Sequence, residues 1–206
     1  MIESNPELKD YIQTELDKNN WGHKVEMIYD NAMEVVLPES VDFIIGELMS
    51  IFCANEYQVQ IFQNLRQYLA PKGKLLPESI TNIIQLAHTD FEQGEKHYPV
   101  IFARHLPQQL SLQRIVNIID LYNVQDLWVE KTIEIIPTLS GKVNCVFLHS
   151  FIQIAEAYNF TGTDSLMPPT VCQLEAPVYV KKGQKVQLHL RFKYGTSLDK
   201  AQFWVE

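Results

Sequence analysis

Residues 41–46 (VDFIIG) form a nearly continuous apolar run that is followed by helical patterning, and this feature constrains the fold most strongly. A strand that is apolar on both faces is typical of the interior of a parallel sheet, where helices cover both faces. Apolar residues recur at helical spacing in residues 7–20 and 57–69, and they alternate in residues 25–29. With residues 81–90 as one more strand, the N-terminal part of the chain is predicted to form half of a doubly wound α/β sheet.

Residues 91–206 follow a different pattern, in which strand-like segments rich in β-branched and aromatic residues alternate with turns. Turns are indicated near Gly141, Gly183 and Gly195. Residues 110–124 fit either a helix or an irregular crossing segment. The sequence therefore predicts a fold class of α/β plus β: an α/β unit that ends near residue 90, followed by an antiparallel β-barrel or sandwich.

The composition excludes several classes of protein. With 25 acidic and 17 basic side chains the formal charge is −8, which argues against non-specific nucleic-acid binding and favours a basic ligand. No apolar run is long enough to span a membrane and the N-terminus is polar, so we expect a cytoplasmic protein without a membrane partner. Cys53, Cys145 and Cys172 are an odd number and lie far apart, which predicts buried free thiols. The six histidines form no metal-binding motif, so we expect no metal site.

Four segments share a pattern with one known enzyme family. Residues 41–90 contain Glu47 and Glu56, nine residues apart in the stretch GELMSIFCANE, and residues 118–124 read IIDLYNV. Residues 178–192 read VYVKKGQKVQLHLRF, and the chain begins with MIESNP. In that order, these four segments resemble parts of the protein arginine methyltransferases: the double-Glu loop, the aspartate-containing crossover, a strand pair of the β-barrel and the strand end that binds the ribose. The resemblance implies a class I S-adenosylmethionine-dependent methyltransferase.

In such an enzyme the first unit, residues 1–90, would be a partial Rossmann-like domain and the second, residues 91–206, a substrate-binding β-barrel. The implied cofactor is S-adenosylmethionine. Glu3 would bind the ribose hydroxyls, the backbone of Ala32 would face the adenine, and Met33 takes the place of a glutamate that contacts the adenine in many members. From the residues alone, Glu3 could instead be a solvated acid or a charge at a helix N-terminus, because Ser4, Asn5 and Pro6 also match a helix cap, and the Ala32 region could be a plain loop.

Glu47 and Glu56 are the predicted catalytic residues. A guanidinium presents a planar array of N–H donors, which two carboxylates can bind while drawing positive charge away from the attacking nitrogen. The resemblance therefore implies that this pair holds the nitrogen that accepts the methyl group. The alternative interpretation is that Glu47 caps a helix N-terminus and that Glu56 is a surface residue.

The sequence departs from the family's pattern in two places. First, only Met1 and Ile2 precede Glu3, so we expect that the chain is truncated or lacks the glycine-rich loop. Second, residues 170–172 (TVC) stand where the family has a Thr-His-Trp loop. Two alternative functions follow: a catalytically inactive fragment that acts as a binding module, and a methyltransferase whose acceptor is not arginine. The expected partner is a protein or small-molecule methyl acceptor and not a nucleic acid. A sheet that lacks its first strand exposes an interior edge, so we also expect self-association, for example a homodimer.

Overall fold

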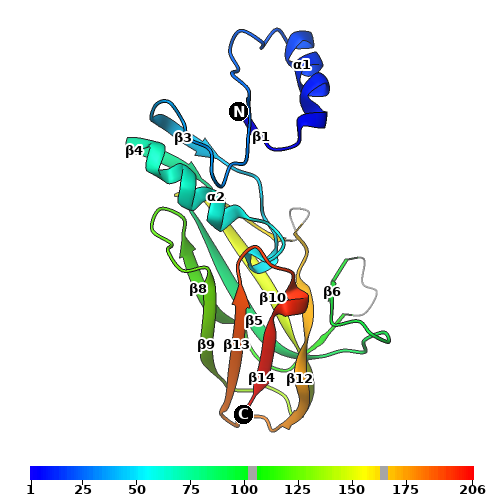
Figure 1. The fold of residues 1–206 in the computed structure, drawn as a ribbon. Coiled ribbons are helices and arrows are strands. Elements are labelled where there is room, and N and C mark those ends of the chain that lie inside the picture. Colours follow the sequence, from blue (N-terminus) through cyan, green and yellow to red (C-terminus); the bar gives the residue numbers. More distant parts are fainter. Residues whose placement is uncertain (102–105, 163–166) are drawn as a thin grey trace.

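The computed structural model describes residues 1–101, 106–162 and 167–206. Figure 1 shows an elongated molecule, with helix α1 and the short parallel strands at one end and the antiparallel sheets and the C-terminus at the other. The helical elements are η1 (Pro6–Leu8), α1 (Lys9–Lys18), η2 (Ile51–Cys53), α2 (Gln58–Leu65), η3 (Arg66–Tyr68) and η5 (Leu198–Lys200). The strands are β1 (Ile2–Glu3), β2 (Ile28–Tyr29), β3 (Val41–Ile45), β4 (Leu69–Leu76), β5 (Ser79–His88), β6 (His97–Pro99), β7 (Gln108–Gln109), β8 (Arg114–Asp120), β9 (Trp128–Ile135), β10 (Gly141–Ala155), β11 (Tyr158–Thr161), β12 (Thr170–Val180), β13 (Val186–Lys193) and β14 (Gln202–Val205).

The parallel strands form two separate pairs. β1 lies beside β2, with Glu3 opposite Tyr29, and β3 lies beside β4, with Ile44 opposite Leu75. Helix α2 follows β3 and buries one apolar face, as its spacing predicts, whereas α1 buries only Leu16. The α/β character of this end of the molecule is therefore confirmed, although β2 is much shorter than the alternation of residues 25–29 suggests.

The antiparallel part consists of two sheets. The larger has seven strands, with the order β6-β12-β10-β5-β7, while β11 also pairs with β10 and β8 also pairs with β5. The smaller has the order β14-β13-β9. Because buried residues of both sheets belong to one hydrophobic core, the arrangement is a sandwich, and no ladder joins the two sheets into a closed barrel within the described ranges. The predicted strands that became β9, β10, β12, β13 and β14 are confirmed.

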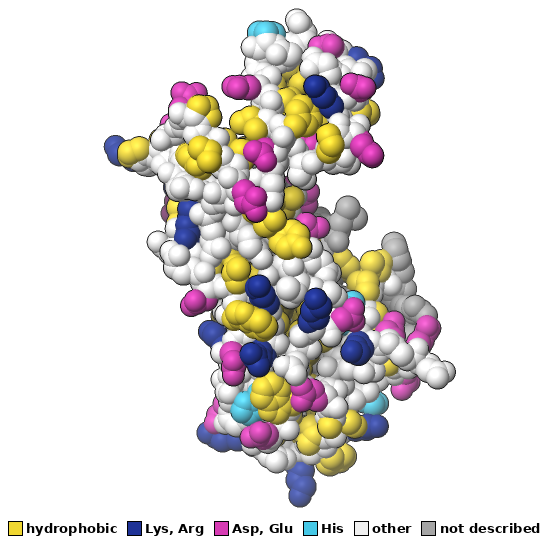
Figure 2. Space-filling view, in the orientation of Figure 1, with side chains coloured by type: hydrophobic (Ala, Val, Ile, Leu, Met, Phe, Trp, Pro, Cys, Tyr) yellow, Lys and Arg dark blue, Asp and Glu magenta, His cyan; other side chains and the backbone are white. Residues whose placement is uncertain are grey.

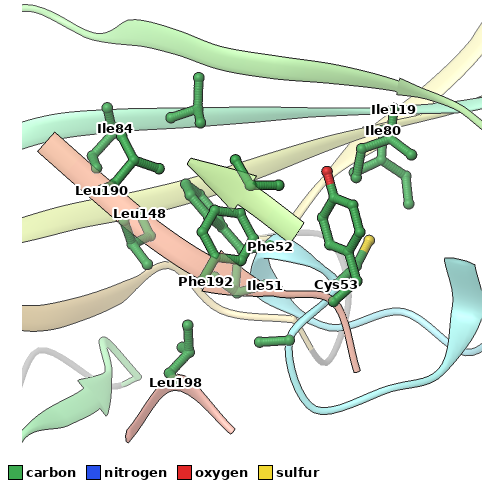
Figure 3. Packing of buried hydrophobic residues seen from close by; sticks show 14 of the residues in the cluster. Ile51, Phe52, Cys53, Ile80, Ile84, Ile119, Leu148, Leu190, Phe192 and Leu198 are labelled. Atoms are coloured by element: carbon green, nitrogen blue, oxygen red, sulfur yellow. The ribbon is translucent and has the colours of Figure 1, made fainter. Parts of the chain in front are cut away.

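The turn η2 reaches from the parallel end into this core. The ring of Phe52 lies against that of Phe192 of β13, with ring centroids 5.4 Å apart (Figure 3). The same cluster contains Ile80 and Leu148 from the larger sheet and Leu190 from the smaller one. The two ends of the molecule are thus joined by shared apolar packing.

Two expectations about individual segments were wrong. Residues 79–88 do not extend the parallel sheet, because β5 pairs antiparallel with β10 and β8 in the larger sheet. Residues 114–120 form strand β8 and not a helix. Both segments are apolar runs whose periodicity alone does not separate a buried strand from a helix or a parallel strand from an antiparallel one. The boundary between two domains at residue 90 stays a prediction, and the pairing of β5 favours an earlier boundary.

No helix among the described residues is long and apolar enough to cross a membrane. The three cysteines are free and buried, as predicted. Burial raises the pKa of the Cys53 and Cys145 thiols from 9.0 to about 12 and also raises the pKa of Cys172, because a thiolate is poorly solvated in an apolar core.

The buried thiols lead to a first prediction. At pH 8, where the thiol and not the thiolate predominates in the fold, a thiolate-specific reagent should label the native protein at least about a hundredfold more slowly than the denatured chain. Above pH 9 the free energy of unfolding should fall, because the unfolded state loses thiol protons that the folded state retains. The measurement is labelling kinetics by absorbance together with urea unfolding at several pH values. Rapid labelling of the native protein would contradict the buried placement.

Candidate functional site

The carboxyl end of the β1–β2 pair holds the first predicted site residue. Glu3 is half-buried, and its carboxylate Oε1 accepts a hydrogen bond of 2.7 Å from the backbone N–H of Asn5. Asn5 in turn caps η1, with Pro6 in the first turn, so the cap that the sequence indicates is present. The second oxygen, Oε2, has no hydrogen-bond partner among the described residues, so Glu3 contributes to a turn and keeps one acceptor free.

The loop that follows β2 comes to the same end of this pair. The backbone N–H of Asp30 donates to the carbonyl of Glu3 at 3.1 Å, so the structure brings Glu3 and the region of Ala32 and Met33 together. Asn64 of α2 fixes the loop, because its Nδ2 donates to the carbonyls of Ala32 and Val35 at 3.1 and 3.0 Å. Asn64 is not among the predicted site residues, and its only sequence signal is a polar residue beside the apolar stripe of α2.

An apolar groove of about 370 Å³ runs between β1 and β3, and we refer to it as the β1–β3 groove. Ala32 lies in its wall, as do Ile2 of β1 and residues 43–45 of β3. Its remaining wall includes Ile61, Phe62 and Leu65 of α2, which pack below the strands, and the acidic residues Glu26 and Glu39. The predicted adenine-binding loop therefore borders a continuous hollow.

Glu47 and Glu56 lie on either side of the turn η2. Both side chains are exposed, and neither makes a hydrogen bond or ion pair with another described residue. The three residues of η2 are fully or almost fully buried, and Phe52 and Cys53 have φ angles of 59° and 50°. Non-glycine residues in this left-handed region cost about 1 kcal/mol or more each, so the surrounding contacts must hold the turn in place. The glutamates thus project from the two ends of a segment that is anchored between them.

A chain of buried and partly buried hydrogen bonds provides this anchor. The Phe52 N–H donates to Ser150 Oγ at 3.1 Å, and that hydroxyl donates to Asn82 Oδ1 at 2.8 Å. Asn82 Nδ2 donates to Asn117 Oδ1 at 3.1 Å, and Asn117 Nδ2 donates to the Tyr194 hydroxyl at 2.6 Å. The chain connects η2 to four elements of the antiparallel sandwich: β10, β5, β8 and the end of β13. These residues are not among the predicted site residues, although polar residues inside apolar strands are a usable signal in the sequence.

A second groove, of about 380 Å³, connects Glu56 to the sandwich. Thr170, the first residue of the altered Thr-His-Trp counterpart, lines this groove together with His97 of β6. His97 Nε2 lies 3.4 Å from Asp199 Oδ1, an ion pair when the imidazole is protonated. The structure therefore brings Glu56 and Thr170 to one groove, and Glu47 is not part of its wall.

Ser50, which lines this groove, and Gln58 of α2 have buried polar atoms without hydrogen-bond partners among the described residues. Ser50 Oγ and both amide atoms of Gln58 are inaccessible to solvent and make no hydrogen bond. Such atoms are available to a bound polar molecule or water. Within the described part of the chain no cluster of three or more His, Cys, Asp or Glu side chains could hold a metal ion, and His105 lies outside the described residues.

Sequence comparison identifies relatives of the N-terminal third. A family model described as "PRMT5 arginine-N-methyltransferase" matches residues 1–76. The histone-arginine methyltransferase CARMER of Drosophila ananassae is 37% identical over 67 residues, which are 32% of this chain and 13% of that protein. The probable CARMER protein of Drosophila melanogaster has the same identity and coverage. The match thus spans only about an eighth of these curated relatives.

Structure comparison extends the likeness to the whole fold. The Trypanosoma brucei PRMT1 enzyme-prozyme heterotetrameric complex with AdoHcy matches with a TM-score of 0.74 and 16% identity, covering 92% of this chain and 69% of that one. Arabidopsis thaliana protein arginine methyltransferase 10 matches with a TM-score of 0.71 and 15% identity, covering 92% and 71%. The chain resembles the protein arginine methyltransferases. The predicted resemblance and fold class are therefore confirmed.

The anchor of the double-Glu segment yields a second prediction. Replacing Ser150 with alanine removes one hydroxyl and leaves the Phe52 N–H and Asn82 Oδ1 buried without partners. Because each unsatisfied group costs about 1–3 kcal/mol, Ser150→Ala should lower the free energy of unfolding by about 2–4 kcal/mol. The matched control, Ser40→Ala, changes an exposed serine and should stay within about 0.5 kcal/mol of the parent. Urea unfolding measures both, and equal stabilities of the two variants would rule out the anchor.

Proposed function

We propose that this chain is the cofactor- and acceptor-binding part of an S-adenosylmethionine-dependent methyltransferase that acts on an arginine nitrogen. One observation carries the proposal: the segment that matches the arginine methyltransferase family model, residues 1–76, contains every predicted site residue. Glu3, Ala32 and Met33 would bind the cofactor, and Glu47 and Glu56 would hold the acceptor. The relatives' names support this activity class, and the solved complex of the Trypanosoma brucei protein contains AdoHcy.

The residues at the end of the β1–β2 pair fit such a cofactor. Glu3 keeps one carboxylate oxygen without a partner, and a ribose diol offers O–H donors that such an oxygen accepts. Ala32 faces an apolar hollow, and Asn64 holds the loop in a fixed conformation, so the purine would meet a preformed wall. When bound, S-adenosylmethionine supplies an electrophilic methyl group on a sulfonium. Met33 is half-buried and adds apolar contact, but its thioether accepts hydrogen bonds only weakly.

The two glutamates would align the acceptor. Methyl transfer from a sulfonium is an in-line displacement, so the protein contributes chiefly orientation and electrostatic stabilisation. Glu47 and Glu56 have no partners among the described residues, and paired hydrogen bonds to a guanidinium would keep its attacking nitrogen in one place. The groove beside Glu56 is lined by Met49, Pro168 and Ile101, which would pack against the aliphatic part of an arginine side chain.

A second candidate function is a non-catalytic binding subunit. It is favoured by the replacement of the Thr-His-Trp loop with residues 170–172. One solved neighbour is a complex of an enzyme with a prozyme, so partnered assemblies exist among proteins with this fold. We further propose that the chain acts in the cytoplasm.

Cofactor binding is the third prediction. Isothermal titration with S-adenosylhomocysteine should give a dissociation constant in the micromolar range, about −8 kcal/mol. Glu3→Gln should weaken this affinity about tenfold, because it removes a charge-assisted hydrogen bond worth about 1.5 kcal/mol. Glu7→Gln changes an exposed acid of the same segment and should leave the affinity unchanged. A chain that releases no heat with this ligand would favour the non-catalytic subunit.

Methyl transfer is the fourth prediction. With labelled S-adenosylmethionine and an arginine-rich peptide, Glu47→Gln and Glu56→Gln should each lower the rate at least about a hundredfold, the size of effect seen when a group that stabilises developing charge is removed. Their affinity for S-adenosylhomocysteine should not change, since neither residue is assigned to the cofactor.

The matched control for this assay is Glu156→Gln, an exposed glutamate in the turn between β10 and β11. Its rate should equal that of the parent chain. Mass spectrometry of the product separates the acceptor classes: methylated arginine supports the proposal, whereas methylation of another residue or of a small molecule would replace arginine as the acceptor. Transfer that is insensitive to both glutamate substitutions would remove them from the site.

A further inference from the structure

Among the described residues, His97 is the only histidine that lines the groove beside Glu56. It lies in β6, which pairs with β12 so that His97 is opposite Cys172. The backbone ladder therefore fixes the imidazole in the wall of the groove. Residues 170–172 contain no histidine, and no predicted site residue is one, so this ring is a chemical group that the candidate site has not yet used.

The two ring nitrogens of His97 have different surroundings. Nε2 is buried, makes no hydrogen bond to another described residue and lies 3.4 Å from Asp199 Oδ1. Asp199 belongs to η5, where the Ser197 hydroxyl donates to Asp199 Oδ2 at 3.1 Å and accepts from the Asp199 N–H at 3.2 Å. A carboxylate held beside Nε2 favours the tautomer with the proton on that nitrogen. Nδ1 is then the nitrogen that can accept a proton.

The charged groups around His97 come from several elements. Glu56 is the only other titratable side chain in the wall of the groove, within the ranges that the structure describes. Cys172 stays a neutral thiol because burial raises its pKa. Figure 2 shows Lys and Arg side chains interspersed with acidic ones over the antiparallel sheets, so neither sign of charge dominates that surface. A separate hollow of about 440 Å³ contains Asp199 and two exposed lysines, Lys96 and Lys200.

Methyl transfer to a guanidinium releases one proton. The guanidinium and the sulfonium each carry one positive charge, whereas a methylated guanidinium and a neutral thioether carry one between them. As the nitrogen bonds to the methyl carbon, the bond from that carbon to sulfur breaks and its electron pair stays on the sulfur, which leaves the excess proton on the nitrogen. A glutamate that took this proton would lose the charge with which it holds the acceptor. A neutral imidazole accepts it without that loss.

We propose that His97 accepts this proton at Nδ1, with Asp199 as the positioning residue that orients the ring and faces the imidazolium once it forms. The proposal rests on the proposed function and adds a catalytic residue to it. The His97 side chain is 26% exposed, so the proton can pass from the imidazolium to water. A positioned base of this kind accelerates proton transfer reactions about a hundredfold to ten-thousandfold.

The fifth prediction is the pH dependence of methyl transfer to an arginine-rich peptide. For the parent chain the rate should fall about tenfold per pH unit on the acidic side, because a protonated imidazole cannot accept a proton. His97→Gln should lower the rate at least about a hundredfold and abolish this acidic fall. Asp199→Asn should lower the rate and retain the fall, since the base itself is still present.

His189→Gln is the matched control for this profile. His189 Nε2 also lies near a carboxylate, 3.5 Å from Glu206 Oε2, but His189 does not line the groove. The rate and the pH profile of this variant should equal those of the parent chain. His97→Ala should regain activity when imidazole is added to the assay, whereas Glu56→Gln should not. This rescue separates a missing base from a misfolded variant.

A measurement without cofactor separates this role from the proposed activity. Adding the arginine-rich peptide to the histidine-labelled parent chain should shift the NMR signal of His97 Nδ1 and leave the His189 signals unchanged. Peptide binding that does not affect His97, an acidic fall that survives in His97→Gln, equal effects of His97→Gln and His189→Gln, or no rescue by imidazole would overturn the proposal and leave the proposed function in place. A parent chain that transfers no methyl group would instead remove the proposed function, and this role with it.

Discussion

The buried hydrogen bond between the Phe52 N–H and the Ser150 hydroxyl is the contact on which the rest of the arrangement depends. It fixes a turn whose backbone is in the left-handed region, and the Phe52–Phe192 contact closes the apolar core around it. A polar group buried without partners would be costly, so the chain of Ser150, Asn82 and Asn117 specifies a single placement of the turn. The parallel end of the molecule is thereby attached to the sandwich at one defined point.

This attachment gives the two glutamates their positions. Glu47 and Glu56 are exposed and have no partners in the described part of the chain, so their location is set by the buried residues between them. Gly195 N–H also donates to the carbonyl of Cys53 at 2.8 Å, which ties the far end of the turn to the end of β13. The sandwich thus supports and orients the segment. Glu56 borders a groove whose opposite wall is formed by residues of the sandwich.

Local elements could be predicted from the sequence because their signals are local. The helical spacing of α2 and the strand at β3 were predicted from local patterns, although Ile44 is the only buried residue of β3 and its burial on both faces is not observed. The turns at Gly183 and Gly195 have φ angles of 80° and 72°, which favour glycine. The partner of β5 could not be predicted, because pairing depends on residues such as His149, opposite Ile83, that lie far away in the chain. Polar residues within apolar segments mark Asn64, Asn82 and Ser150 in the sequence, but the partners of these side chains lie far away in the chain and could not be predicted.

The loop around Ala32 joins the β1–β2 pair to helix α2. Ala32 follows the strand whose partner carries Glu3, and it also lines the β1–β3 groove. The Asn64 side chain, which donates to the carbonyls of Ala32 and Val35, holds this loop on α2. Because α2 also follows directly on the segment that contains Glu47 and Glu56, one helix fixes the loop predicted to face the cofactor and ends the segment predicted to hold the acceptor. The relative position of these two parts of the candidate site therefore depends on the packing of α2, which buries Val59, Phe62 and Leu65.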